Sequence, residues 1–226
     1  MAADPVGPRI TYYDDATGER IELSTVTLTN WAAKTGNLLR DELGAGPTTR
    51  VAVLLPAHWQ TAAVLFGIWW IGAEVVLSGL QEKGADIALC TADRLSEADD
   101  AVGSGEIAVL SLDPFGKPAA DLPVGVTDYA TSVRVHGDQI SPERHPGPVL
   151  DGRSVTDVFV DAQAGAAAQG FTSDDRVMSM AGWTTADELT ANLLAVFVVG
   201  ASLVQVANPD ASVLDRRRQM EKTTRG

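Results

Sequence analysis

The sequence predicts an α/β protein with two similar βαβ-containing subdomains, whose mainly parallel sheets are sandwiched by helices. The first observation is a repeat: a short apolar strand, a long apolar helix, a Gly-Ala pair and a second short strand occur in residues 51–77 and again in 177–206. The second is that residues 51–55 show no polar alternation, which is typical of a parallel strand buried on both faces. The third is an Ala-rich helical segment and a polar turn before each copy, at 44–49 and 170–175.

Length and composition are those of an ordinary globular protein. The chain has 226 residues, of which 45% are hydrophobic and 21% charged, enough for one large domain or two small ones with a substantial core. The single cysteine, Cys90, excludes an internal disulfide. Because it ends the apolar run 87–89, we expect a buried, unreactive thiol.

The formal charge of −13 argues against nucleic acid as a partner, because phosphates would be repelled. Positive charge gathers near residue 226, where Asp215 and Glu221 are interleaved with it. We expect a solvated helix end or tail there, with an anionic surface or acidic partner as the alternative. The basic residues are Arg216, Arg217, Arg218, Lys222 and Arg225.

No targeting or membrane-spanning segment is expected. Residues 1–9 lack the basic start and apolar core of a signal peptide. Residues 61–80 are apolar but contain Glu74 and three glycines, and residues 193–204 are too short to cross a bilayer. We expect both to be helix-plus-strand units of a core, in a cytoplasmic protein.

The chain begins with a predicted hairpin. Residues 10–13 and 20–23 are short strand candidates, and DDATG at 14–18 is a suitable turn between them. A helix over 28–43 follows, which Gly44 ends.

The first repeat supplies the next elements. The strand at 51–55 stops at Pro56, and the helix over 59–71 is apolar nearly all round, as in a helix sandwiched between other elements. Further strands are predicted at 75–77, 87–89 and 107–110.

Residues 114–153 are the least regular part and hold six of the eleven prolines. Within them 126–135 suggests a short helix or strand, and 140–148 a loop or linker. We therefore expect a first α/β subdomain at 1–135 and a proline-rich linker at 136–153.

A second, incomplete α/β subdomain is predicted at 154–226. It contains helices over 157–169 and 186–199 and a basic helix or tail from 211.

Five segments are similar to motifs of the adenylate-forming enzymes, the family of acyl-CoA synthetases, peptide-synthetase adenylation domains and luciferases. ITYY at 10–13 resembles its "LTYxEL" start, RVAVLLP at 50–56 its "RVALLLPN" strand, and GIWWIGAEVV at 67–76 its "LKAGAxxVPL". Residues 153–177 resemble "H-x-x-L…GLTPGDRVL", and GASLV at 200–204 resembles "GATVVL". The likeness covers nearly the whole chain and about the first half of the family's large domain, and it implies two similar α/β subdomains.

The resemblance also implies an ATP-phosphate loop like T-S-G-T-T-G-x-P-K-G just before Ser154. Such a loop needs glycine amides, hydroxyls and a lysine around the phosphates. Residues 140–152 (ISPERHPGPVLDG) contain no lysine, three prolines that lack N–H donors, and two acids, Glu143 and Asp151, that repel phosphate. The residues left to attract an anion are Arg144, His145 and Arg153.

Two more departures bear on activity. Where the family often has an aromatic-His-Gly element lining the acyl pocket, this chain has AGWT at 181–184. Trp183 would fill such a pocket, although core packing is the favoured interpretation. The family's adenine loop, Mg²⁺-binding Glu, ribose-binding Asp and lid with the catalytic Lys correspond to positions beyond Gly226, so none is assigned here.

Other candidates are weaker. His58 follows a strand end and begins a helix, where either a site or a helix cap is expected. His136 and His145, with Asp138 and Glu143, could form a metal site, but a solvated loop is favoured. The pocket candidates are Trp183, His58, Arg144 and Arg153.

The sequence therefore predicts a non-catalytic relative of the adenylate-forming enzymes that acts as a binding, regulatory or scaffold module. A protein partner or a second copy is expected, and no cofactor, catalytic residue or metal ligand is assigned. The alternatives are a binder of a nucleotide, acyl or CoA-type ligand, and half of a split adenylate-forming enzyme.

Overall fold

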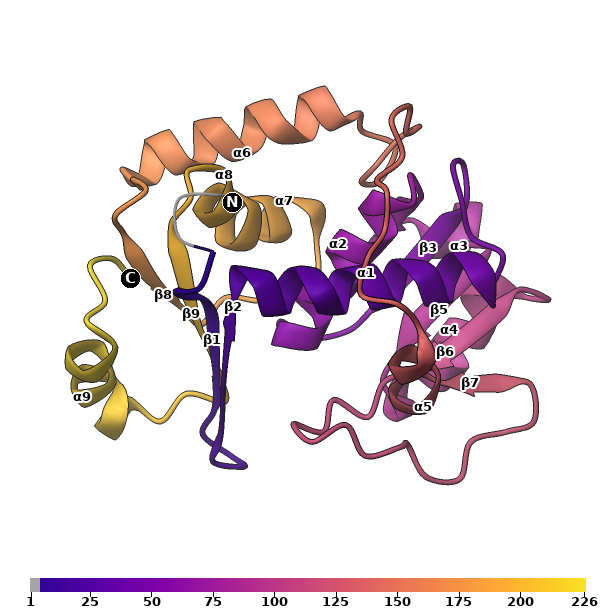
Figure 1. Ribbon diagram of the computed structural model, residues 1–226, viewed down its shortest axis with the longest axis horizontal. Helices are drawn as coiled ribbons and strands as arrows, with labels where there is room; N and C mark the ends of the chain where they lie inside the picture. Colours follow the sequence, from indigo (N-terminus) through magenta and orange to yellow (C-terminus); the bar gives the residue numbers. More distant parts are fainter. Residues whose placement is uncertain (1–4) are drawn as a thin grey trace. The chain divides into compact units, whose positions relative to one another are not determined.

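The computed structural model describes residues 5–226 (Figure 1). Its contacts divide the chain into two compact units, each described here by itself. Unit 1 contains the residues up to Leu28 together with 57–59 and 156–226. Unit 2 contains 29–56 and 60–155.

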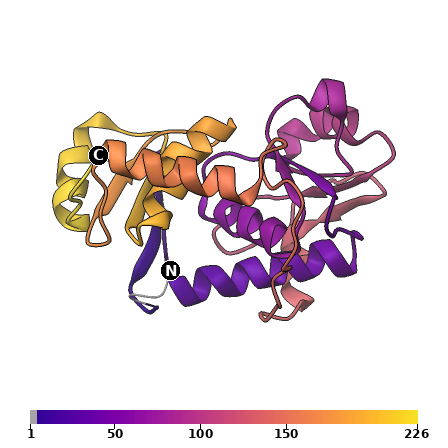
Figure 2. The same ribbon diagram turned by 90° about the horizontal axis from the view of Figure 1, so that it is seen from above.

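The sheet of unit 1 joins the two ends of the chain. Its strand order is β2-β1-β9-β8, so the first strands lie beside the last ones (Figures 1 and 2). The predicted hairpin is confirmed, because β1 and β2 are antiparallel and Gly18 N–H donates to the Asp14 carbonyl at 2.8 Å. The other neighbours are parallel. The strands are β1 (Pro8–Asp14), β2 (Glu19–Ser24), β8 (Arg176–Ser179) and β9 (Ser202–Ala207).

The helices of unit 1 follow the predicted pattern with one interruption. The helix expected over 186–199 contains a π-helical turn, Thr190–Leu194, between two short α-helical pieces. After the last helix, Arg225 forms a parallel bridge with Val177 at the edge of β8. The helices are α6 (Val155–Gln169, in this unit from Thr156), α7 (Ala186–Leu189), α8 (Ala195–Val198) and α9 (Ala211–Glu221).

The sheet of unit 2 is parallel, with strand order β4-β3-β5-β6-β7. Residues 51–55 are all buried, as predicted for a strand covered on both faces, and so is every residue of β4 and β5. The strands are β3 (Arg50–Leu54), β4 (Glu74–Val76), β5 (Ile87–Cys90), β6 (Glu106–Val109) and β7 (Val126–Asp128).

Helices α1 and α2 of unit 2 touch through glycines. A Cβ on Gly67 would lie 2.8 Å from the Ala32 carbonyl oxygen and 2.9 Å from the Gly36 nitrogen. The two backbones therefore approach as closely as glycine allows. The helices are α1 (Thr25–Asp41, in this unit from Thr29), α2 (Trp59–Trp70, from Gln60), α3 (Leu80–Lys83), α4 (Leu95–Val102) and α5 (Tyr129–Ser132), with 3₁₀ turns at Ala92–Arg94 and Val133–Val135.

Cys90 lies in the core of unit 2 with a fully buried thiol, as expected. Burial raises the pKa of this thiol to about 11, so little reactive thiolate forms near neutral pH.

The contacts group the chain differently from the predicted boundaries at 135 and 153. The hairpin belongs with the last third of the chain because β1 pairs with β9, and residues 136–153 belong with unit 2. Across residues 5–226, no helix is both long and apolar enough to cross a membrane.

Candidate functional site

The proline-rich segment, residues 136–153, belongs to unit 2 and is bound first to α1. Lys34 Nζ donates to the His136 carbonyl at 2.6 Å, and Asn37 Nδ2 donates to the carbonyls of Gly137 at 2.8 Å and Gln139 at 3.0 Å. The first residues of the segment are therefore held on α1 by hydrogen bonds from the Lys34 and Asn37 side chains to backbone carbonyls.

The same segment is then bound to α2 and to the edge of β4. Glu143 N–H donates to the Trp70 carbonyl at 2.7 Å, and Trp69 Nε1 donates to the Val149 carbonyl at 2.8 Å. Val75 N–H also donates to Val149, at 3.0 Å, and its carbonyl accepts from Asp151 N–H at 3.0 Å. Residues 149–151 are thus paired with β4 like a short additional strand.

Two further amides of the segment are bound by carboxylates of the protein itself. His145 N–H donates to Glu143 Oε1 at 2.9 Å, and Gly152 N–H donates to Glu74 Oε1 at 2.5 Å. A tight turn follows, in which Val149 N–H donates to the Arg153 carbonyl at 2.8 Å and Arg153 N–H donates to the Leu150 carbonyl at 2.9 Å. A phosphate loop instead leaves such amides converging on open space.

Carboxylates reinforce this arrangement. Asp151 accepts from Leu77 N–H at 2.9 Å and from the amide and hydroxyl of Ser78 at 3.3 and 2.8 Å. Glu74 is 8% exposed and lies 3.5 Å from Arg50 Nε. The amides of Leu77, Ser78 and Gly152 are therefore already bound to carboxylates.

The four pocket candidates divide between the two units, with Arg144 and Arg153 in unit 2. Arg144 is exposed, and the adjacent His145 side chain is 92% exposed. Arg153 is half-buried at the turn that leads to α6, where its N–H donates to the Leu150 carbonyl at 2.9 Å.

His58 lies in unit 1 and is almost fully buried. Its ring meets Tyr12 edge-on with centroids 4.3 Å apart, and its Nε2 lies 3.6 Å from Glu19 Oε1. Trp59 Nε1 donates to the same Glu19 oxygen at 3.4 Å. Burial lowers the pKa of His58, although Glu19 opposes the shift. This is a packed interior position.

Trp183 also lies in unit 1 and is 2% exposed. In the described part of the chain, its Nε1 and the Oε1 of Gln205 find no hydrogen-bond partner. The amide nitrogen of Gln205 donates to the Ala181 carbonyl at 3.0 Å, which links β9 to the loop before Trp183.

One of the suggested metal ligands, His136, pairs with a residue outside that group: its Nε2 lies 2.8 Å from Glu42 Oε1. Within residues 5–226, no group of three or more His, Cys, Asp or Glu side chains is arranged to hold a metal ion.

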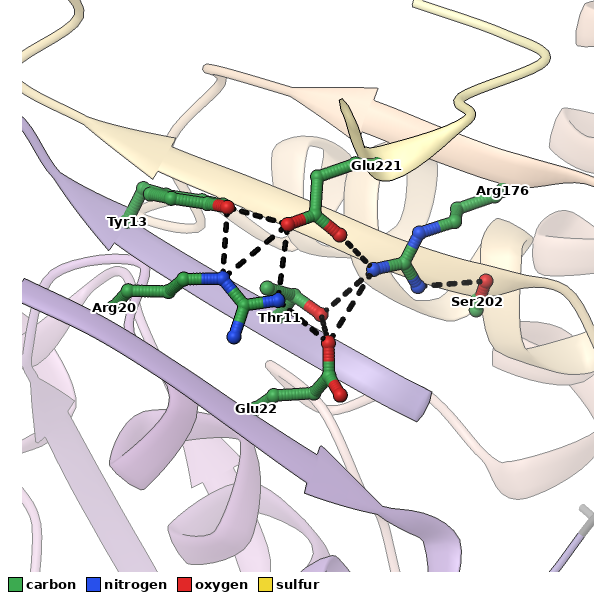
Figure 3. A network of polar contacts seen from close by, with 7 residues as sticks. All are labelled: Thr11, Tyr13, Arg20, Glu22, Arg176, Ser202 and Glu221. Atoms are coloured by element: carbon green, nitrogen blue, oxygen red, sulfur yellow. Dashed lines mark hydrogen bonds and ion pairs between the residues drawn. The ribbon is translucent and has the colours of Figure 1, made fainter. Parts of the chain in front are cut away.

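The structure adds a polar network in unit 1 that the sequence analysis missed (Figure 3). Glu221, at the end of α9, accepts from the Tyr13 hydroxyl, from Arg176 Nη2 and, at 3.0 Å, from Arg20 Nη2. Glu22 accepts from Arg20 Nη2 at 2.9 Å and from the Thr11 hydroxyl at 3.1 Å. The network therefore combines two arginines and two glutamates from β2, β8 and α9 with Thr11 and Tyr13 of β1.

The hairpin register contains the signal that could have revealed part of this network. Tyr13 is the strand partner of Arg20, and Thr11 is the partner of Glu22. The turn at 14–18 fixes both pairs and places them on one face, since side chains two residues apart share a face. The contributions of Arg176 and Glu221 depend on long-range pairing, which local patterns do not encode.

Beside the network lies a groove of about 480 Å³ lined by both signs of charge. Arg9 and Lys222 are among its basic residues, and Asp174 and Asp175 among its acidic ones. The Arg9 guanidinium is bound to the carbonyls of Gly200 and Ala201 at 2.6 and 2.7 Å. Because acidic and basic side chains line the groove together, they are better suited to pairing with one another than to binding an anion selectively.

Comparison of the whole sequence with known proteins gives a full-length relative. No protein-family model matches the chain. A "TIGR03089 family protein" from Mycobacterium tuberculosis (strain ATCC 25618 / H37Rv) is 69% identical over 229 residues, covering 100% of this chain and 93% of that protein.

Solved structures share the fold at low sequence identity. A Brucella canis acyl-CoA synthetase matches with a TM-score of 0.81 at 18% identity, over 99% of this chain and 44% of its own. The anthranilate CoA ligase AuaEII, solved with anthranoyl-AMP, has a TM-score of 0.73 at 17% identity, over 98% and 45%. The N-terminal domain of FACL13 from Mycobacterium tuberculosis has a TM-score of 0.68 at 18% identity, over 97% and 58%.

The chain therefore spans about half the length of the solved structures that it matches. These likenesses confirm the predicted α/β architecture as that of the amino-terminal part of the adenylate-forming enzymes. The identity to the mycobacterial protein extends over the entire sequence, and on that basis the chain belongs to the TIGR03089 family.

Proposed function

We propose that this chain is a non-catalytic relative of the adenylate-forming ligases that acts as a binding, regulatory or scaffold module. One observation carries the proposal: the segment at 140–153 is paired with α2 and β4, and carboxylates hold its amides. Shared fold alone does not imply shared chemistry, so the argument depends on this segment.

Binding a triphosphate here would require the segment to open. Each backbone hydrogen bond that is broken costs about 0.5–1.5 kcal/mol, and the bonds of Val75 and Gly152 would be among the first lost. Glu74, Glu143 and Asp151 would then face the phosphates with like charge. Opening and repulsion therefore both oppose nucleotide binding.

Isothermal titration with ATP and AMP tests the proposal, with an active acyl-CoA ligase as the positive control. We expect no saturable heat up to about 1 mM nucleotide, which corresponds to a binding free energy weaker than about −4 kcal/mol. Because the chain spans about half of the solved ligases, binding is the decisive measurement and pyrophosphate exchange is secondary. Micromolar ATP affinity would refute the argument that the segment excludes nucleotide, and turnover as well would refute a non-catalytic role.

A second candidate function is binding of a small acyl, nucleotide or CoA-type ligand without catalysis. The buried Nε1 of Trp183 and Oε1 of Gln205, which lack partners among the described residues, favour it because unpaired buried polar atoms are costly. A thermal-shift screen with acyl-CoAs, fatty acids and adenylates distinguishes the two. A shift that disappears in Trp183→Phe supports the second candidate, and the absence of any shift removes it.

The proposal includes a protein partner or a second copy of the chain as the binding target, and a cytoplasmic location. Size-exclusion chromatography with light scattering tests self-association directly. Cell fractionation with an antibody against the chain tests the location.

A further inference from the structure

Helix α9 is attached to unit 1 with very little apolar burial. Among its eleven residues, all described, the one buried side chain is a carboxylate, that of Glu221. Leu214, partly buried, packs on the cluster of Met178, Val204 and Val206, whereas Met220 is 64% exposed. Most surface helices are held by a continuous apolar stripe, which α9 lacks.

Charged contacts replace that stripe. Arg217 donates to both oxygens of Asp15, at 2.5 and 3.0 Å, and its guanidinium lies 4.1 Å from the centre of the Tyr13 ring. One turn further along, at the last residue of the helix, Glu221 enters the network of Tyr13, Arg20 and Arg176 (Figure 3). Ion pairs therefore fasten the carboxy-terminal half of α9.

The charge of this segment is opposite to that of the rest of the chain. Residues 211–226 contain five basic and two acidic residues, a net charge of +3. Since the whole chain carries −13, the remaining residues carry −16. Attraction between a cationic segment and an anionic body is screened by salt, with a Debye length of about 10 Å at 0.1 M and about 3 Å at 1 M.

The segment beyond α9 covers the edge of β8. Thr224 N–H donates to the Arg176 carbonyl at 2.9 Å, and Met178 N–H donates to the Arg225 carbonyl at 2.9 Å. Asp175 fixes this stretch, because its Oδ1 accepts from the Thr224 hydroxyl at 2.6 Å and lies 3.4 Å from Arg225 Nε. Arg176 N–H also donates to the Thr224 hydroxyl at 3.0 Å, so detaching the segment would uncover three backbone groups of β8.

We propose that residues 211–226 form an ionic latch that opens from unit 1 while the sheet stays folded. Opening uncovers the edge of β8 and the apolar surface of Met178, Val204 and Val206. Salt shifts the equilibrium because it screens the attraction between the cationic segment and the anionic remainder of the chain, whereas the mostly buried pairs at Asp15 and Glu221 are screened less.

Hydrogen exchange on the full chain, followed by mass spectrometry, tests the latch. We expect amides of α9 to exchange about tenfold faster when NaCl rises from about 0.05 M to about 1 M, as screening weakens the attraction between the segment and the rest of the chain. Amides of β1 and β9 serve as the internal reference and should be unchanged.

Two variants and a matched control sharpen the test. Glu221→Gln should speed exchange in α9 about tenfold and reduce the effect of salt, because it removes the charge at the centre of the network. Tyr13→Phe removes one contact and keeps all charges, so it remains informative if the first variant does not fold. Asp215→Asn is the control, since Asp215 pairs with Arg218 of the same helix at 3.0 Å and is 92% exposed; it should leave α9 attached.

The proposal is overturned if α9 and β1 exchange at one common rate, because the helix would then open only by global unfolding. It is equally overturned if salt has no effect on α9, or if Asp215→Asn loosens the helix as much as Glu221→Gln does.

Discussion

At the scale of single residues, Asp151 shows how one side chain can fix the conformation of two chain segments, the turn at 150–153 and the residues after β4. Its carboxylate accepts three hydrogen bonds from Leu77 and Ser78, and its own amide pairs with Val75. The residue adopts a positive φ of 46°, which Asp tolerates better than most residues. It therefore fixes both the turn at 150–153 and the chain after β4.

Replacing Asp151 should destabilise unit 2 in a graded way. Asp151→Ala leaves two amides without their acceptor and should lower the unfolding free energy by about 1–3 kcal/mol. Asp151→Asn keeps one acceptor and the turn preference, so its effect should be smaller. Urea denaturation measures the series, with Ser78→Ala, which loses one contact, as the control; equal stability of all three variants would contradict the assignment.

His58 should make the stability of the fold depend on pH. Its pKa in the folded protein lies below the ordinary value of 6.5, because burial outweighs the favourable charges of Glu19 and Asp14. Below about pH 6.5 the unfolded chain then binds more protons, so stability is complete above that pH and falls as the pH drops. The Tm of wild type should therefore decrease between about pH 7.5 and pH 5 by more than that of His58→Gln, and equal decreases would disprove this.

At the scale of elements, the positions of strands and helices were largely predictable, whereas their irregularities were not. Apolar periodicity revealed the hairpin and both βαβ units. It missed α4, because the buried face of that helix consists of two alanines, Ala98 and Ala101, in an otherwise acidic sequence. It also gave no sign of the π-turn at Thr190–Leu194, since a one-residue insertion in a helix leaves the apolar pattern almost unchanged.

The contact between α1 and α2 should be the least tolerant helical position to enlargement. Gly67→Ala places a methyl group 2.8 Å from the backbone of Ala32, which forces the helices apart and should cost about 1–3 kcal/mol. Gly165→Ala in α6 is the matched control, because its new Cβ meets only Ala195 Cβ, at 3.6 Å. That change should be neutral or stabilise by up to about 1 kcal/mol. Thermal denaturation compares the two, and similar melting temperatures would contradict the close contact.

At the scale of the whole molecule, the fold class followed from the repeat, but the grouping of the elements did not. Residues up to Leu28 belong to the same unit as residues 156–226. This grouping depends on the pairing of β1 with β9, in which Ile10 lies opposite Leu203. Nothing local in either strand specifies that partner, because strand order is set by long-range packing. The candidate site shows the same limit. Proline and acid content indicated an altered loop at 140–153, yet its pairing with β4 required the structure.

Cys90 should report on the unfolding of unit 2 as a whole. Its thiol is fully buried and its pKa is raised to about 11, so alkylation requires the core to open. We expect no labelling by iodoacetamide under native conditions and complete labelling in urea. The labelling transition should coincide with loss of circular dichroism from the helices, and labelling well before that transition would indicate a locally open core.

The position of β1 also bears on how the protein forms during synthesis. The residues of unit 2, 29–56 and 60–155, have all been translated before β9, whereas Ile10 can pair with Leu203 only after Leu203 has been translated. Until then the hairpin presents an unpaired strand edge, which is a template for aggregation. Nascent chains stalled before β9 should accordingly depend on chaperones for their solubility.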